Sequence, residues 1–213
     1  MRIDEISAIK VCDISLNYNE GDRRTHSGLW DTKWVESKSN IFTQNNGRCY
    51  FIVVSGEIYK IGFSDQKGGI KKTIGSYKGS GNSGQPSDRT HGVHILIAEE
   101  LLKGNTVEFY FTYNEDIEVP LTLMDGTTKT ITHSIGGKIL ESENIKLFLE
   151  KENRHPIWNL QEAGKPWPSY LQESRKKLIG DVKNGIAQQP ATLKDIKSRL
   201  REDRIESLLK EKE

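Results

Sequence analysis

The sequence predicts an α+β fold in which a small antiparallel sheet, built around one β-hairpin, is flanked by helices. Two local patterns indicate this fold. A run of aromatic and β-branched residues is interrupted by a short turn, and several later segments carry apolar residues at helical spacing. The chain has 213 residues, of which 34% are hydrophobic. This composition suffices for the core of one large domain with long polar insertions.

Charge and cysteine content exclude several classes of protein. Lys and Arg number 31 against 30 Asp and Glu, which leaves a net charge of +1 and excludes a strongly basic, histone-like protein. The cysteines, Cys12 and Cys49, are too few for a disulfide framework. No apolar run approaches the roughly 18 residues of a membrane span, and residues 1–5 lack the apolar core of a signal peptide. We expect a soluble cytoplasmic protein.

Composition along the chain suggests three regions. Residues 1–45 form an N-terminal arm whose tryptophans and lysines between 30 and 38 are candidate DNA contacts. Residues 46–162 form the core. Residues 163–213 form a helical extension, in which an apolar stripe from 193 to 209 suggests a docking or dimerisation surface.

The hairpin is the strongest local signal, with strands at 50–54 and 57–62. A two-residue loop at Ser55 and Gly56 would place Tyr50 and Lys60 on opposite faces of the sheet. A three-residue loop with Gly56 in the left-handed conformation pairs residue 50 with residue 60. Because glycine is the residue that this position favours, we predict the three-residue loop, which makes Tyr50 and Lys60 direct neighbours.

Two further segments follow the hairpin. Residues 67–77 are basic and predict a short helix or turn, whereas residues 79–84 match G-x-G-x-x-G without a preceding strand and predict a flexible loop. A helix is predicted over 89–102, capped by Ser87 or Asp88. His91 and His94 lie three apart on it, without a third metal ligand nearby in sequence, and we expect them to face solvent or to cap.

The second half of the chain predicts strands and then helices. Strands are expected at 107–113 and 118–132, the latter folded by a type I′ turn at Asp125 and Gly126. Helices are expected at 138–152, after Gly136 and Gly137, and at 169–183. A final charged helix carries the apolar stripe.

Two segments of the hairpin resemble a known family. The segment RCYFI at 48–52, followed by YKIG at 59–62, is similar to the two signature strands of the GIY-YIG nucleases. It resembles the type II restriction endonucleases in which lysine replaces the tyrosine of the second motif. The two key positions, Tyr50 and Lys60, are ten residues apart, as the short hairpin of this family requires.

A distal stretch extends the resemblance. Residues 141–144 (ESEN) open a predicted helix, and Asn159 follows it, 16 residues after Glu143. In the family, a helical glutamate is followed by an asparagine at about this distance. The resemblance therefore covers residues 48–159.

The resemblance implies hydrolysis of a phosphodiester bond. Tyr50 would be the general base, and Lys60 would favour its phenolate form or accept its proton. Glu143 would be the sole protein ligand of one Mg²⁺, whose remaining ligands would be water and phosphate oxygens. Asn159 would hold the end of the glutamate helix or a water molecule.

The sequence departs from the family at the arginine expected on the helix after the second motif. Lys71 and Lys72 stand at that distance, and the first arginine in range is Arg89. Either Lys72 replaces the arginine or the chain returns to deliver Arg89, whose planar guanidinium grips phosphate bidentately. Tyr77 would be a second phenol at the phosphate.

We therefore expect a Mg²⁺-dependent endonuclease that cleaves double-stranded DNA at specific sites as a homodimer. Contacts to bases would come from residues 30–38, from the loop 79–89 and from the hairpin around Asp125. Three alternatives remain open: a catalytically inactive nucleic-acid-binding module on the same fold, a phage or repair nuclease of low specificity, and an unrelated α+β domain that acts through protein contacts.

Overall fold

The computed structural model describes residues 1–17, 29–35, 41–44, 46–65, 67–79, 85–184 and 196–203. The chain divides into two compact units. The first comprises Met1–Cys12, Trp34–Thr73 and Glu108–Asn159, and the second comprises Asp13–Lys33, Ile74–Val107 and Leu160–Glu213.

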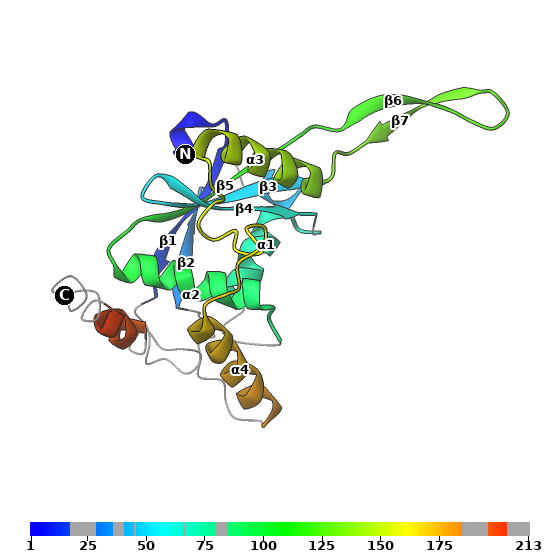
Figure 1. Cartoon of the computed structure of the whole chain (residues 1–213). Coiled ribbons are helices and arrows are strands. Elements are labelled where there is room, and N and C mark those ends of the chain that lie inside the picture. Colours follow the sequence, from blue (N-terminus) through cyan, green and yellow to red (C-terminus); the bar gives the residue numbers. More distant parts are fainter. Residues whose placement is uncertain are drawn as a thin grey trace. The chain divides into compact units, whose positions relative to one another are not determined.

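The predicted α+β class is confirmed by the elements in Figure 1. A five-stranded sheet has the order β2-β1-β5-β3-β4, and a separate two-stranded sheet is formed by β6 and β7. The strands are β1 (Ile9–Leu16), β2 (Trp30–Trp34), β3 (Arg48–Val54), β4 (Glu57–Ser64), β5 (Val107–Tyr113), β6 (Ile117–Thr122) and β7 (Thr128–His133). The α-helices are α1 (Gly69–Gly79), α2 (Asp88–Leu102), α3 (Gly137–Glu152) and α4 (Ser169–Lys183), and short 3₁₀ turns lie at Ile3–Glu5 and Ile41–Thr43.

The core of the first unit lies between α3 and one face of the β3–β4 hairpin (Figure 1). All seven residues of β3 are buried. Successive strand residues point to opposite faces, so Cys49, Phe51 and Val53 share a face. That face packs against Phe148 of α3, with Leu140 partly buried beside it. The hairpin is therefore positioned by the hydrophobic burial of this face.

Helix α3 begins at Gly137, one residue before the predicted start. Gly136 is its N-cap, and the amide of Gly137 donates to the carboxylate of Asp65 over 2.8 Å. A Cβ atom at Gly137 would overlap the backbone of Arg48 and the Asp65 carboxylate. Only glycine allows this close approach of the helix start to β3. The helix ends at Asn153, which adopts the left-handed conformation with φ of 51°.

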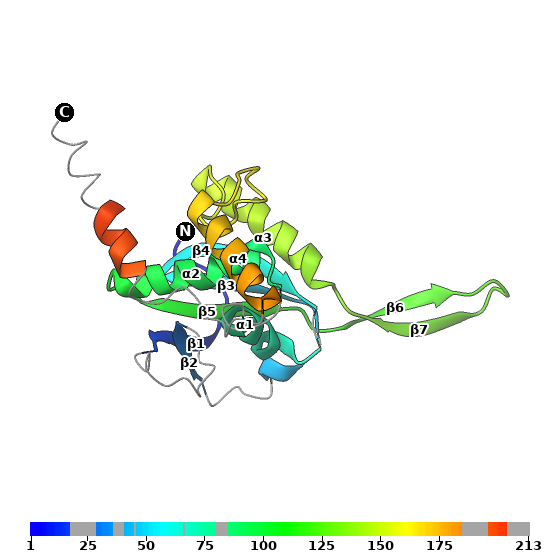
Figure 2. The same cartoon turned by 90° about the horizontal axis from the view of Figure 1, so that it is seen from below.

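Strands β6 and β7 form a hairpin, here called the arm, that extends away from β5 and α3 in both Figure 1 and Figure 2. Its turn differs from the predicted type I′ turn. The amide of Gly126 donates to the carbonyl of Leu123 over 3.0 Å, and only Gly126 has a positive φ there, 81°. This is a longer loop with one left-handed glycine, because Asp125 keeps a negative φ and accepts from the Thr127 amide instead.

In the second unit, Ser87 caps α2, as predicted, by accepting from the amide of Thr90 over 3.1 Å. The expectation that His91 and His94 face solvent or cap is wrong, because both are buried. His91 bonds the hydroxyl of Ser174 on α4 over 2.9 Å, and His94 packs its ring 5.5 Å from that of Trp30. Complete burial lowers the pKa of His94 to about 3. These histidines therefore belong to the packing of this unit.

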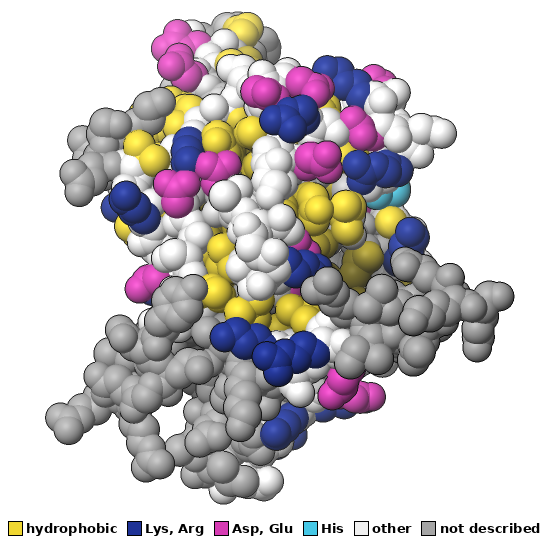
Figure 3. Space-filling model, turned by 90° about the vertical axis from the view of Figure 1, so that its left-hand side faces the viewer, with side chains coloured by type: hydrophobic (Ala, Val, Ile, Leu, Met, Phe, Trp, Pro, Cys, Tyr) yellow, Lys and Arg dark blue, Asp and Glu magenta, His cyan; other side chains and the backbone are white. Residues whose placement is uncertain are grey.

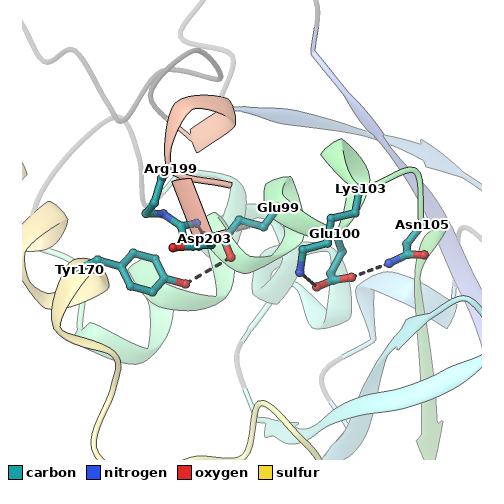
Figure 4. Close-up of polar contacts among 7 residues, drawn as sticks. All are labelled: Glu99, Glu100, Lys103, Asn105, Tyr170, Arg199 and Asp203. Atoms are coloured by element: carbon teal, nitrogen blue, oxygen red, sulfur yellow. Dashed lines mark hydrogen bonds and ion pairs between the residues drawn. The ribbon is translucent and has the colours of Figure 1, made fainter. Parts of the chain in front are cut away.

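A polar cluster joins the last helical segment that the structure describes, 196–203, to α2 and α4 of the same unit (Figure 4). Arg199 pairs with Glu99 and with Asp203, and its guanidinium lies 3.9 Å from the ring centre of Tyr170. The Tyr170 hydroxyl donates to Glu99 over 3.2 Å. Burial raises the pKa of Glu99, and the positive charge of Arg199 opposes this shift. The remainder of the predicted C-terminal helix lies outside the described residues.

No helix in the described ranges is long and apolar enough to cross a membrane. On the face shown in Figure 3, basic and acidic side chains alternate over the upper half of the described surface. A net charge of +1 is thus spread as a mixture of both signs there.

Candidate active site

The β3–β4 hairpin places Tyr50 and Lys60 on one face, but not in the predicted register. Tyr50 lies opposite Gly62, and Lys60 lies opposite Ile52. The predicted direct pair of Tyr50 and Lys60 is therefore wrong. The two residues are diagonal neighbours, at roughly 7–8 Å between Cα atoms, which is within reach of an aromatic and a long side chain.

Two local features explain the difference in register. The turn is a two-residue loop, with φ of 47° at Ser55 and 86° at Gly56, rather than the predicted three-residue loop. A β-bulge then follows: Val53 pairs with Ile58 and Ile52 pairs with Lys60, which leaves Tyr59 as the extra residue. The two-residue loop alone would have placed Lys60 on the face opposite Tyr50. The bulge shifts the strand by one residue and so returns Lys60 to the face of Tyr50.

Tyr50 and Lys60 are both buried, with exposed fractions of 3% and 1%. The Tyr50 phenol lies across Gly62, where a Cβ atom would overlap its hydroxyl and ring. The ring centre of Tyr50 is 6.5 Å from that of Phe109 on β5. Gly62 therefore provides the space that the phenol occupies, and it is a site residue that the motif contained but the sequence analysis did not single out.

Asn159 holds the outer edge of β4. Its side-chain oxygen accepts from the Ile61 amide and its side-chain nitrogen donates to the Ile61 carbonyl, each over 2.8 Å. The adjacent amide of Trp158 donates to the carbonyl of Tyr59, the bulged residue, over 2.8 Å. The expected contact of Asn159 with the glutamate helix or a water gives way to this one, because β4 is an edge strand with backbone groups that require partners.

The glutamates of α3 differ in environment. Glu143 is the predicted metal ligand, and its side chain is 62% exposed and pairs with Lys146 over 2.6 Å. Glu141, two residues earlier, is 2% exposed and pairs with Lys138 over 2.8 Å. Its carboxylate contributes to the raised pKa of Cys49, of which burial is the larger cause. Glu141 thus faces the hairpin, whereas Glu143 faces outward.

The structure does not bring these carboxylates to the face of Tyr50 and Lys60. Helix α3 packs on the face that carries Cys49 and Phe51. Tyr50 lies between these two residues in the strand, so it points to the opposite face. The predicted grouping of a phenol, an ammonium and a carboxylate thus separates into a Tyr50–Lys60 face and an α3 face.

The three remaining predicted residues lie on α1 and α2. Lys72 is exposed in the first turn of α1 and belongs to the first unit. Tyr77, near the end of α1, is buried, and Arg89 is half-buried in the first turn of α2. Both belong to the second unit. Among the contact residues predicted between 30 and 38, Trp30 is buried and donates to the carbonyl of His94 over 3.1 Å, so it is not available to a base.

Arg48 is a buried charge that sequence reasoning passed over. It is 1% exposed, and its Nε donates to the carbonyl of Asn46 over 2.8 Å. Its guanidinium lies against the Cα of Gly69, at the start of α1. Burial lowers the pKa of Arg48, and the carboxylate of Asp65 opposes this shift. Arg48 clamps the segment before β3, and its position at the start of the first motif was the available signal.

Two solved structures are similar to this chain. A mutant of bacteriophage T4 EndoII shares 22% identity over 75% of this chain and 99% of that chain, with a TM-score of 0.42. The restriction endonuclease HPY188I in complex with product DNA shares 24% identity over 70% of this chain and 78% of that chain, with a TM-score of 0.35. No family model and no curated protein match this chain.

Both identities lie below 25% and both TM-scores below 0.5, so the function of this chain has to come from its own residues. Within the described ranges, no three His, Cys, Asp or Glu side chains gather as a metal site. The hairpin buries a phenol and an ammonium on one face, and α3 carries two carboxylates on the other.

Proposed function

We propose that this protein is a Mg²⁺-dependent endonuclease that hydrolyses phosphodiester bonds in double-stranded DNA, with the site specificity of a type II restriction enzyme. The observation that carries the proposal is the burial of Tyr50 and Lys60 on one face of the hairpin. A buried lysine beside a buried phenol, over a glycine that makes room for the ring, is the kind of arrangement that functional sites use.

The two buried groups have complementary roles in hydrolysis. The Tyr50 phenolate accepts a proton from the attacking water, and the Lys60 ammonium stabilises that phenolate. Lys72, which lies in the same unit as Tyr50 and Lys60, supplies the cation for the phosphate. Gly62 and Asn159 are positioning residues, since the first accommodates the phenol and the second holds the backbone of β4.

The carboxylates of α3 suit a magnesium ion, which prefers hard oxygen ligands and commonly uses one or two protein carboxylates together with water and phosphate oxygens. When bound, the ion neutralises charge on the phosphate and the leaving oxygen. Glu143 is accessible and Glu141 is held beside the hairpin. Each is paired with a lysine ammonium, and a metal ion would take over that lysine's role as counter-ion.

The test is incubation of the purified chain with plasmid DNA, with and without Mg²⁺. Discrete fragments that require Mg²⁺ are expected, and a continuous smear would instead indicate a nuclease of low specificity. Tyr50→Phe is expected to lower the rate by more than about a hundredfold, as removal of a general base does. Unchanged cleavage by Tyr50→Phe would contradict the proposal.

The metal ligand is identified by comparing Glu141→Gln with Glu143→Gln. Each substitution removes a charge and keeps the shape. The variant that loses cleavage, regains part of it at high Mg²⁺ and still binds DNA identifies the ligand. The other variant is its matched control.

A homodimer is proposed for this activity, since two active sites related by a twofold axis cut the two strands of a palindromic site.

A second function, nucleic-acid binding without hydrolysis, is favoured by one observation: α3 and its carboxylates pack on the face opposite Tyr50 and Lys60. In that case the wild-type chain shifts labelled duplex DNA in a gel but shows no Mg²⁺-dependent cleavage. Both glutamine variants then retain the shift unchanged.

A further inference from the structure

The arm formed by β6 and β7 separates its side chains into an apolar and a polar face. Register pairs Val119 with Ile131 and Leu121 with Lys129. Because strand residues alternate, Ile117 joins these on one face, whereas the opposite face carries Glu118, Pro120 and threonines from both strands. Such an alternation is typical of a sheet with one face buried against another element.

Nothing within the described residues covers the apolar face. No residue from 114 to 134 is buried, and Ile117 and Leu121 have exposed fractions of 44% and 41%. Figures 1 and 2 show the arm extending away from α3 of its own chain. An isolated two-stranded hairpin is marginally stable in water, so the pattern predicts that this face is covered by a partner in solution.

Charge argues against nucleic acid as that partner. Residues 114–134 contain four carboxylates, Glu115, Asp116, Glu118 and Asp125, against one lysine, Lys129, which leaves a net charge of −3 with His133 neutral. Proteins that bind DNA neutralise its phosphates with lysine and arginine. The arm would instead repel the polyanion, so the base contacts expected from the Asp125 hairpin have no electrostatic support.

A complementary surface exists on α3 of the same chain. Among the residues that the structure describes outside the arm, the exposed large hydrophobic ones are Ile139, Leu147 and Ile157, of which the first two lie on α3. Ile139, Glu143 and Leu147 are spaced by four and share one side of the helix, here called the outer stripe. Lys138, Lys146 and Lys151 are exposed on α3 against Glu143 and Glu150, which leaves the exposed part of the helix with net positive charge.

We propose that the arm of one chain packs its apolar face on the outer stripe of α3 of a second copy. The apolar face of the arm carries the ammonium of Lys129, and the outer stripe is apolar and carries the carboxylate of Glu143, so the two surfaces match in polarity and in charge. A twofold axis lets each arm cover the α3 helix of the other chain, so both exposed surfaces are satisfied in a closed dimer. Glu143 then lies within the interface.

The first test is the molar mass of the full chain by light scattering across a concentration series. The wild type is expected to reach the mass of two chains. Leu121→Glu on the arm and Leu147→Glu on α3 each place a carboxylate in the contact, and each is expected to raise the dissociation constant by about tenfold or more. Thr130→Glu, on the polar face of the arm, is the matched control and is expected to leave the mass unchanged.

The second test identifies which surfaces meet. A Leu121→Cys chain mixed with a Leu147→Cys chain and treated with a short bis-maleimide is expected to give a two-chain product. Leu121→Cys alone is expected to give none. The native thiols do not interfere, because Cys12 and Cys49 are both buried.

Three results would overturn the proposal. One is a wild type with the mass of a single chain at all concentrations. Another is equal cross-linking by Leu121→Cys alone, which would mean that arm pairs with arm. The third is loss of duplex DNA binding by Leu121→Glu at unchanged mass, which would make nucleic acid the partner of the arm. None of these measurements depends on cleavage, so they stand or fall separately from the nuclease proposal.

Discussion

The two hairpins of the first unit form by similar local means but lie in opposite environments. Strand β3 is buried at all seven positions, whereas β6 and β7 have no buried residue. Both hairpins alternate side chains, use β-branched residues and turn at a glycine with positive φ, Gly56 and Gly126. The comparison teaches that turn chemistry and alternation produce a hairpin, while the elements around it decide whether one face, both faces or neither is covered.

The edges of the two hairpins differ in the same way. The outer edge of β4 receives the side-chain amide of Asn159 and the backbone amide of Trp158. The arm is a sheet of two strands, each of which is an edge. Edge strands with open backbone groups favour pairing with another chain. The outer edge of the buried hairpin thus has hydrogen-bond partners within its own unit, whereas the edges of the arm favour pairing with another chain.

The largest contrast should come from truncating the two apolar faces. Phe51→Ala in β3 is expected to lower the free energy of unfolding by about 3–5 kcal/mol, because it leaves a cavity in a fully buried core. Val119→Ala in β6 is expected to cost less than about 1 kcal/mol, since Val119 is only half-buried. Urea unfolding of both variants measures the contrast. Equal losses would mean that the arm is as well packed as the core.

The next largest effect should come from opening the edge of β4. Asn159→Ala removes one donor and one acceptor from Ile61, at an expected cost of about 2–3 kcal/mol. Asn159→Asp keeps the acceptor but buries a carboxylate whose second oxygen faces the Ile61 carbonyl, so it is expected to cost at least as much at neutral pH. The same urea titration compares the two variants, and Thr130→Ala in the arm is the control. A cost under about 0.5 kcal/mol for Asn159→Ala would show that water replaces the amide freely.

The glycines of the two hairpins should respond differently to alanine. Gly62→Ala forces a Cβ atom onto the Tyr50 phenol and is expected to cost about 1–3 kcal/mol. It should also reduce plasmid cleavage more than about tenfold, because a displaced phenol misaligns its proton transfer. Gly126→Ala meets no neighbouring atom but has a φ of 81°, so about 1 kcal/mol of backbone strain and unchanged cleavage are expected. Reversed effects on cleavage would remove Gly62 from the site.

The smallest effect on stability, and the clearest readout of exposure, comes from thiol labelling. Burial raises the pKa of the Cys49 thiol on β3, and the carboxylate of Glu141 adds to the shift. Because the thiolate is the reactive form, labelling of Cys49 should stay slow from pH 7 to pH 9. A thiol placed in the arm by Thr130→Cys should label quickly and faster as pH rises. Rapid labelling of native Cys49 would show that the core face opens readily.

The sequence predicted those parts of the fold that depend on neighbouring residues. Ser87 capped its helix because its side chain reaches an amide three residues on. The glycine pair marked the start of α3, where a Cβ atom at Gly137 would overlap the backbone of Arg48 on β3. The shared face of Tyr50 and Lys60 was also predicted, although the structure reaches it through a different turn and a bulge.

Features that depend on distant partners could not be predicted in this way. The bulge at Tyr59 has its carbonyl satisfied by Trp158, which lies far along the chain. The face of α3 that turns inward was ambiguous, because Leu140 packs inward while Ile139 and Leu147 are exposed. Helix α3 thus carries apolar residues on two of its sides. Residue spacing alone could therefore not show that Glu141 faces inward and Glu143 outward.

Because of the bulge at Tyr59, the exact number of residues in β4 determines which face of the sheet each of its side chains takes. Loops usually absorb insertions and deletions, whereas a strand shifted by one residue turns every side chain over. Inserting one residue between the turn and Lys60, with the bulge unchanged, would direct the lysine and the glycine toward α3 and would pair Tyr50 with Ile61. We expect natural length variants of this chain to spare this strand and to accumulate instead at the tip of the arm, where Met124 is fully exposed.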